Sequence, residues 1–176
     1  YLLSGLDPLT RFGRSAIYAR FDQMVWRPDS TAVQGLTLFG AFVAGTGGRQ
    51  YEDYFLNGGA VLTGTFPGRP YDTLGVGFAL EHFSPLGLAN YRAARASLGL
   101  DNRGIAATQT ILELSYGIQL TPAVRLMPNL QYVISPQPQE KFAFRPRAIP
   151  DAVVVGAKLS VDLFTLAGLA KGPGSN

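Results

Sequence analysis

The sequence contains no cysteine and a single histidine among its 176 residues. Without cysteine, neither a disulfide framework nor a thiolate metal site can form. The one histidine, His82, excludes a histidine-rich zinc site and leaves one candidate imidazole base. The glycine-rich run at 45–49 lacks the Lys-Ser or Lys-Thr that a phosphate loop requires. We therefore expect no cofactor, no metal and no enzymatic activity.

Charged residues and long apolar runs are also scarce. Only 15% of the residues are charged, against about a quarter in ordinary soluble domains. The longest apolar stretch, around 35–45, is interrupted by Thr37. It falls short of the ~18–20 residues that a membrane helix needs, which excludes a helical membrane protein. The net charge of +3 comes from dispersed Lys and Arg, so no nucleic-acid binding is expected.

What is present points to strands and turns. There are 21 glycines, 12 prolines, 11 phenylalanines and 8 tyrosines, a composition that favours β-structure. Apolar residues alternate with small or polar ones in seven segments, at 15–27, 35–45, 54–64, 72–83, 109–120, 124–134 and 151–163. Such alternation gives each strand one apolar and one polar face.

The length of these segments separates two all-β classes. Strands of soluble proteins run about five or six residues, whereas a tilted membrane strand needs about 9–11. The predicted fold is therefore a transmembrane antiparallel β-barrel, with a soluble β-sandwich as the alternative.

Connection lengths give a second test, because outer-membrane barrels alternate short periplasmic turns with long extracellular loops. The turn at 121–123 is tight, while 84–108 and 135–150 are long. This predicts periplasmic turns at 28–34 and 65–71, and extracellular loops at 46–53 and 1–14. Complete bacterial barrels have an even number of strands, and lipid does not tolerate open sheet edges. Seven strands predict that the rest come from missing N-terminal sequence or from another chain.

Several segments resemble one family. They are IYARFDQMVWR at 17–27, GLTLFGAF at 35–42, GTFPGRPYDTLGVGF at 64–78, TILELSYGIQLTPAVRLMPNLQYVISP at 110–136 and AIPDAVVVGAKLSVDLF at 148–164. Together they resemble the closing strands of carbohydrate-selective outer-membrane porins of the OprB type. The resemblance implies a sixteen-stranded barrel in the bacterial outer membrane, of which residues 1–164 supply the last seven strands. It also implies passive diffusion of small carbohydrates such as glucose.

One departure concerns the end of the chain. The family usually stops at an aromatic residue that ends the last strand, whereas here a tail, 165–176, follows Phe164.

The polar faces of the strands supply candidate pathway residues. Sugars present hydroxyl groups, for which charged and amide side chains are suitable partners. The alternative for any one of these residues is pairing across neighbouring strands that only stiffens the wall. The candidates are Arg20, Asp22, Glu81, Glu113, Gln119, Arg125, Asn129, Gln131, Lys158 and Asp162.

The segment 84–100 begins with Ser-Pro and continues with an Ala- and Arg-rich run, which predicts a short helix. Arg92 and Arg95 could contact lipopolysaccharide phosphates or fold over the barrel mouth, or lie on a solvated helix face. Expected partners are small sugars, outer-membrane lipid and lipopolysaccharide, and a homo-oligomer is left open. Two other functions stay open: a non-conducting barrel component of a larger envelope assembly, and a lipid-modifying barrel enzyme.

Overall fold

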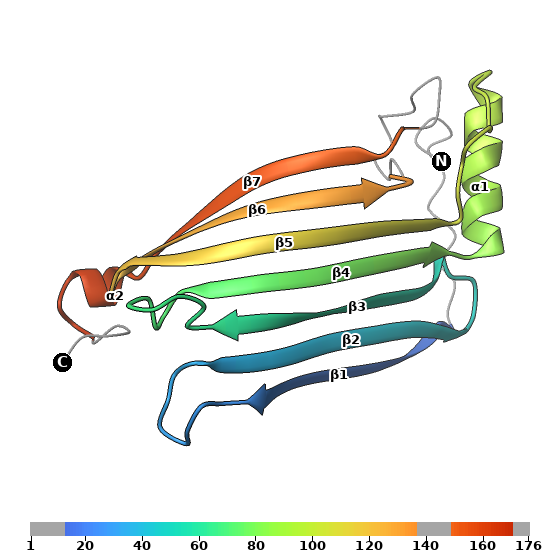
Figure 1. Ribbon diagram of the computed structural model, residues 1–176. Helices are drawn as coiled ribbons and strands as arrows, with labels where there is room; N and C mark the ends of the chain where they lie inside the picture. The colour runs from blue at the N-terminus through green and yellow to red at the C-terminus, as the bar shows by residue number, and fades with distance from the viewer. Residues whose placement is uncertain (1–12, 137–148, 171–176) are drawn as a thin grey trace.

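A computed structural model describes residues 13–136 and 149–170, and in these ranges the chain forms one antiparallel sheet of seven strands in sequence order (Figure 1). The all-β antiparallel fold expected from the alternation is confirmed. The strands are β1 (Ser15–Trp26), β2 (Gly35–Gly47), β3 (Glu52–Thr63), β4 (Thr73–Phe83), β5 (Thr108–Thr121), β6 (Val124–Ile134) and β7 (Ala152–Val161). Two helices accompany them, α1 (Pro85–Ser97) and α2 (Leu163–Leu166).

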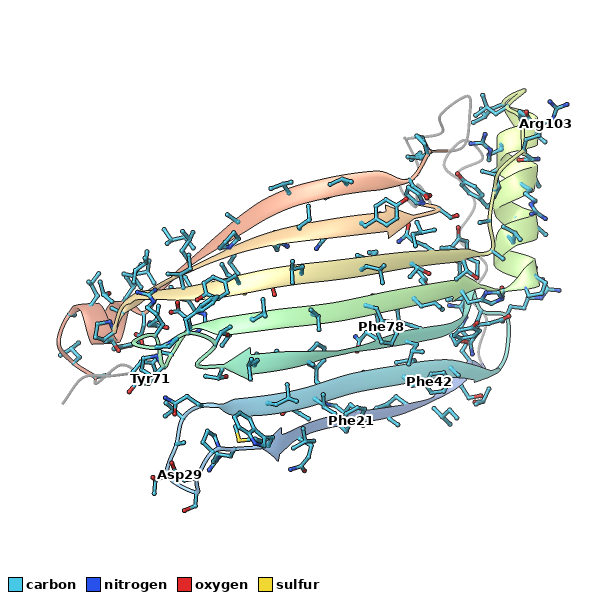
Figure 2. The ribbon with its side chains drawn as sticks, viewed as in Figure 1. Phe21, Asp29, Phe42, Tyr71, Phe78 and Arg103 are labelled. Carbon is cyan, nitrogen blue, oxygen red and sulfur yellow. The ribbon has the colours of Figure 1, made fainter. Side chains whose placement is uncertain are left out.

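Each strand pairs with the next in a register that carries rows of residues across the sheet. One row runs from Phe39 to Gly59, Gly77 and Glu113 on successive strands. Because directly paired residues lie on the same face, the ladders define two faces. The apolar face carries Leu, Val and Phe side chains, among them the labelled Phe21, Phe42 and Phe78 (Figure 2). The opposite face, called here the polar face, carries the charged and amide residues.

The apolar face has no protein layer over it in the part of the chain that the structure describes. Beyond the strand ladders, the main contact between elements is a small one of α1 with β4. Leu114 in the middle of β5 remains 47% exposed, and Val76 on β4 remains 51% exposed. A continuous apolar surface of this kind is typical of contact with lipid or protein rather than water. The β-sandwich alternative, which requires a second sheet here, is wrong.

Successive connections lie at opposite ends of the sheet (Figure 1). At one end lie α2 and the connections 27–34, 64–72 and 122–123. At the other end lie α1, the start of β1 and the connections 48–51 and 84–107. The connections alternate between the two ends as expected, but the expected separation by length is incomplete, because 48–51 is shorter than 27–34 and 64–72. The assignment of the two ends to periplasm and exterior stays a prediction, and residues 1–12 of the expected first loop lie outside the described residues.

Helix α1 forms where the sequence predicted it. Pro85 occupies the first turn, and the Ser84 hydroxyl accepts a hydrogen bond from the Gly87 amide at 2.9 Å. The same hydroxyl donates to the Gln50 carbonyl at 2.6 Å, which fastens the start of the helix to the connection between β2 and β3. None of the helices in the described ranges is long and apolar enough to cross a membrane.

The expectation for Arg95 is wrong. Its side chain is only 1% exposed, and its guanidinium donates through Nε and Nη2 to the Asp101 carbonyl while lying over the Tyr91 ring. The buried guanidinium ties the segment after α1 to the helix. Arg95 therefore does not present its charge to lipopolysaccharide or to solvent. Arg92 is exposed and donates to the Ile105 carbonyl at 3.2 Å.

Candidate functional site

The polar face collects all the predicted pathway residues that lie within strands. Arg20 and Asp22 come from β1, Glu81 from β4, Glu113 and Gln119 from β5, Arg125, Asn129 and Gln131 from β6, and Lys158 from β7. Their common face follows from the register, because Glu113 pairs with Gln131, Gln119 with Arg125, and Met127 with Lys158.

Arg125 is fixed to the wall of this face. Its Nη2 donates to Thr73 Oγ1 on β4 at 2.5 Å, so the side chain crosses the whole of β5. It crosses at Gly117, where an added Cβ would lie 2.2 Å from Nη2. The missing side chain of Gly117 thus provides the space that the guanidinium fills. Weaker contacts of 3.5 Å reach the Tyr71 carbonyl and Gln119 Oε1.

A carboxylate and two amides form a second group across β5 and β6. Gln131 Nε2 donates to Glu113 Oε2 at 2.5 Å, and Asn129 Nδ2 lies 3.5 Å from the same oxygen. Both amides therefore serve one carboxylate oxygen, and Oε1 makes no hydrogen bond to a described residue. Glu113 is half-buried, so Oε1 can accept from a molecule that passes over the face.

Arg20, Asp22 and Lys158 behave differently. All three are exposed, and within the described residues they form no ion pair or hydrogen bond. Cross-strand pairing, the alternative to a pathway role, is therefore seen for Arg125 and Glu113 but not for these three residues. Arg20 and Asp22 stand two residues apart on β1, on the same face, so a donor fork and an acceptor lie side by side.

Asp162 lies beyond the polar face of the strands. The last strand ends at Val161, two residues earlier than predicted, and Asp162 is the N-cap of α2. Its Oδ1 accepts from the amides of Phe164 and Thr165 at 3.0 and 3.2 Å. These bonds satisfy amides that a helix start leaves without partners, and they lower the pKa of Asp162.

Asp72, which the sequence analysis did not single out, organises the end of the sheet that carries α2. Asp72 is 2% exposed and accepts from Arg69 Nε at 2.8 Å, from the Tyr116 hydroxyl at 2.9 Å and from the Gln119 amide at 2.9 Å. Burial raises the pKa of Asp72, but the three hydrogen bonds outweigh it and hold the pKa below its ordinary value. The signal was the Arg69-x-x-Asp72 spacing after a Pro-Gly turn.

The polar face offers hydrogen-bond donors and acceptors to polar solutes. On the polar face, Arg125 of β6 is fixed to a neighbouring strand, whereas Arg20 and Asp22 lie on the edge strand β1 and have no partner among the described residues. His82, the one candidate base, lies on the apolar face, where its ring stacks on Tyr54 at 4.9 Å and its Nδ1 lies 2.8 Å from Thr108 Oγ1. No group of three or more potential metal ligands occurs within the described ranges.

Comparisons with known proteins agree with this architecture. The model of the OprB family, carbohydrate-selective porins, matches residues 2–163. The chain is 26% identical over 163 residues to Porin B of Pseudomonas aeruginosa, covering 89% of this chain and 34% of that protein. The high-pH structure of Pseudomonas putida OprB superimposes with a TM-score of 0.64 at 25% identity, covering 82% of this chain and 34% of that one.

The chain thus spans about a third of the length of the relatives it matches. The resemblance seen in the strand motifs is confirmed, and so are the porin-type barrel architecture and the location in the outer membrane. Since the family match spans residues 2–163, nearly the whole chain, the chain belongs to the OprB family of carbohydrate-selective porins.

Proposed function

We propose that the protein is a passive channel for small carbohydrates and that the polar face described above lines the route. The observation that carries the proposal is the separation of the two faces. The strand-borne charged and amide candidates share one face, and the opposite face presents exposed Leu, Val and Phe. A barrel wall with lipid outside and water inside requires this separation.

The free groups on the polar face are the proposed solute contacts. The Arg20 guanidinium offers several donors, and the Asp22 and Glu113 carboxylates offer acceptors for sugar hydroxyls. Arg125, which is tied to Thr73 across Gly117, instead sets the shape of the wall. Contacts of this kind are individually weak and exchange readily with water, which allows a solute to leave as easily as it enters.

The ends of the sheet take opposite sides of the membrane in this proposal. The end that carries α1 faces the exterior, because long connections of outer-membrane barrels lie there. The exposed Arg92 and Arg103 are then available to the phosphates of lipopolysaccharide, whereas the buried Arg95 is not.

The experiment is reconstitution of the full-length protein that contains this chain. In planar bilayers we expect stepwise KCl conductance that glucose reduces, and in proteoliposomes we expect faster swelling with glucose than with a trisaccharide. A glucose-insensitive conductance would contradict carbohydrate passage. The absence of any conductance by an assembled barrel would support the non-conducting envelope component instead.

A further inference from the structure

A pair of adjacent glycines on β3 carries an aromatic ring on each face of the sheet. On the polar face, Phe39 of β2 extends over Gly59, where an added Cβ would lie 2.7 Å from Phe39 Cζ. The same Cζ lies 3.8 Å from the Cβ position of Gly77 on β4. A side chain standing upright on the sheet would not reach two neighbouring strands, so the ring lies along the wall.

The apolar face has a matching arrangement one residue away. There Phe78 of β4 lies over Gly58, with its Cε1 3.1 Å from the position of an added Cβ. Phe78 is 40% exposed on the apolar face, and Figure 2 labels it in the middle of the sheet. Filling of the space above a glycine accounts for a ring on both faces, and on the polar face it also leaves an aromatic surface among hydrogen-bonding groups.

The row that contains Phe39 also carries hydrogen-bonding groups at both sides of the ring. In register order it reads Asp22, Phe39, Gly59, Gly77, Glu113 and Gln131. Neighbouring strands lie about 4.8 Å apart. Asp22 is therefore about one strand from the base of the ring, and Glu113 about one strand from its tip.

The two carboxylates at the sides of the ring have acceptor capacity to spare. Asp22 is exposed without a partner among the described residues, and Glu113 uses Oε2 for its two amide neighbours, which leaves Oε1. Gly59 and Gly77, which lie between Phe39 and Glu113, have no side chains that would cover the ring.

From this geometry we propose that Phe39 is a stacking platform for a pyranose ring, with Asp22 and Glu113 receiving hydroxyls at its edges. The inference rests on the proposed carbohydrate channel and adds a residue that selects sugars within it. A pyranose has a C–H face that suits an aromatic surface and a rim of hydroxyls that suits carboxylates. An acyclic polyol of similar size has the hydroxyls but no rigid C–H face, so the platform favours the ring form.

The test uses the full-length protein in proteoliposomes, with uptake of glucose and of sorbitol measured over a range of concentrations. Phe39→Leu should raise the half-saturation concentration for glucose about threefold to tenfold, as expected for the loss of one stacking contact. Sorbitol uptake and KCl conductance should change little. Phe39→Tyr, which keeps the ring, should retain the glucose value.

Phe78→Leu is the matched control, because it removes the equivalent ring over the adjacent glycine on the lipid side. It should leave glucose half-saturation unchanged. An unchanged glucose value in Phe39→Leu, or an equal change in Phe78→Leu, overturns the platform while the channel itself stands. If the unsubstituted protein admits no sugar, the channel proposal fails and the platform with it.

A second variant keeps the test decisive if Phe39→Leu does not assemble. Asp22→Asn alters an exposed side chain without a partner among the described residues, so the barrel should form normally. It should weaken glucose saturation about threefold, and an unchanged value would overturn the proposal.

Discussion

The two faces of the sheet are built from the same strands but obey different rules. Across the middle of the apolar face the side chains need only be apolar, and the exposed Val76 and Leu114 have no protein layer against them in the part of the chain that the structure describes. On the polar face position matters, because Arg125 depends on a glycine one strand away and Glu113 on the amides of the next strand. The comparison shows that the surrounding solvent sets one face and specific neighbours set the other.

The largest effect should come from placing a charge on the apolar face. Leu114→Arg puts a guanidinium at the middle of β5, where lipid contact makes it cost about 2–4 kcal/mol. Ser115→Arg adds the same group to the polar face one residue along and should cost far less. Urea titration of the full-length barrel in vesicles, followed by gel mobility without heating, measures both. Equal losses would contradict the assignment of the faces.

A smaller effect is expected at Asp72, which ties the connection before β4 to β5 by accepting from the Tyr116 hydroxyl and the Gln119 amide. Asp72→Ala removes the acceptor shared by three donors, two of them from half-buried residues, and should lower the free energy of unfolding by about 2–3 kcal/mol. Asp29→Ala is the control, because that exposed carboxylate caps Thr31 and Ala32 where water can replace it.

The Asp72 interactions should also depend on pH in a defined direction. Because folding lowers the pKa of Asp72, its contribution is complete above the unfolded pKa of about 3.9 and is lost as the pH falls through the lower folded value. Unfolding titrations between pH 7 and pH 2 should therefore show Asp72→Ala and the unsubstituted protein converging in acid. A constant difference at all pH values would contradict this role.

The smallest effect distinguishes free from fixed cations on the polar face. A charge about 10 Å from a passing ion in water contributes about 0.4 kcal/mol, or about a twofold change in partition. Arg20→Gln removes a cation that has no partner among the described residues and should shift the anion-to-cation permeability ratio by about that factor. Arg125→Gln removes one held against the wall and should shift it less. Reversal potentials in a KCl gradient provide the comparison, and a larger shift for Arg125 would contradict it.

Much of the fold was predictable because alternation with period two is a local signal. It located the seven strands and their faces, and the Ser84-Pro85 signature located α1. The alternation predicted too long a last strand, because Asp162 continues the pattern but its carboxylate caps helix α2. In that short element, local capping outweighed the strand pattern.

The arrangement of the site was harder to predict from the sequence because it depends on contacts between strands. The bond from Arg125 to Thr73 joins residues 52 positions apart in the chain, and it requires a register that alternation alone does not specify. Asp72 was missed because the alternation made it the first residue of the predicted strand 72–83, and no local pattern marks its link to Tyr116, 44 positions along the chain. Arg95 was misjudged because an arginine on a short surface helix is ordinarily solvated, whereas here a neighbouring carbonyl and an aromatic ring enclose it.

Gly117 has a consequence for how such a lumen can diverge between relatives. Its empty side-chain position holds the Arg125 guanidinium of the next strand against the sheet, which in the proposed channel keeps that positive charge away from the centre. Any larger residue at 117 would displace that guanidinium toward the passing solute. A neutral substitution can thus act electrically, changing ion preference while every charged residue of the sequence stays the same.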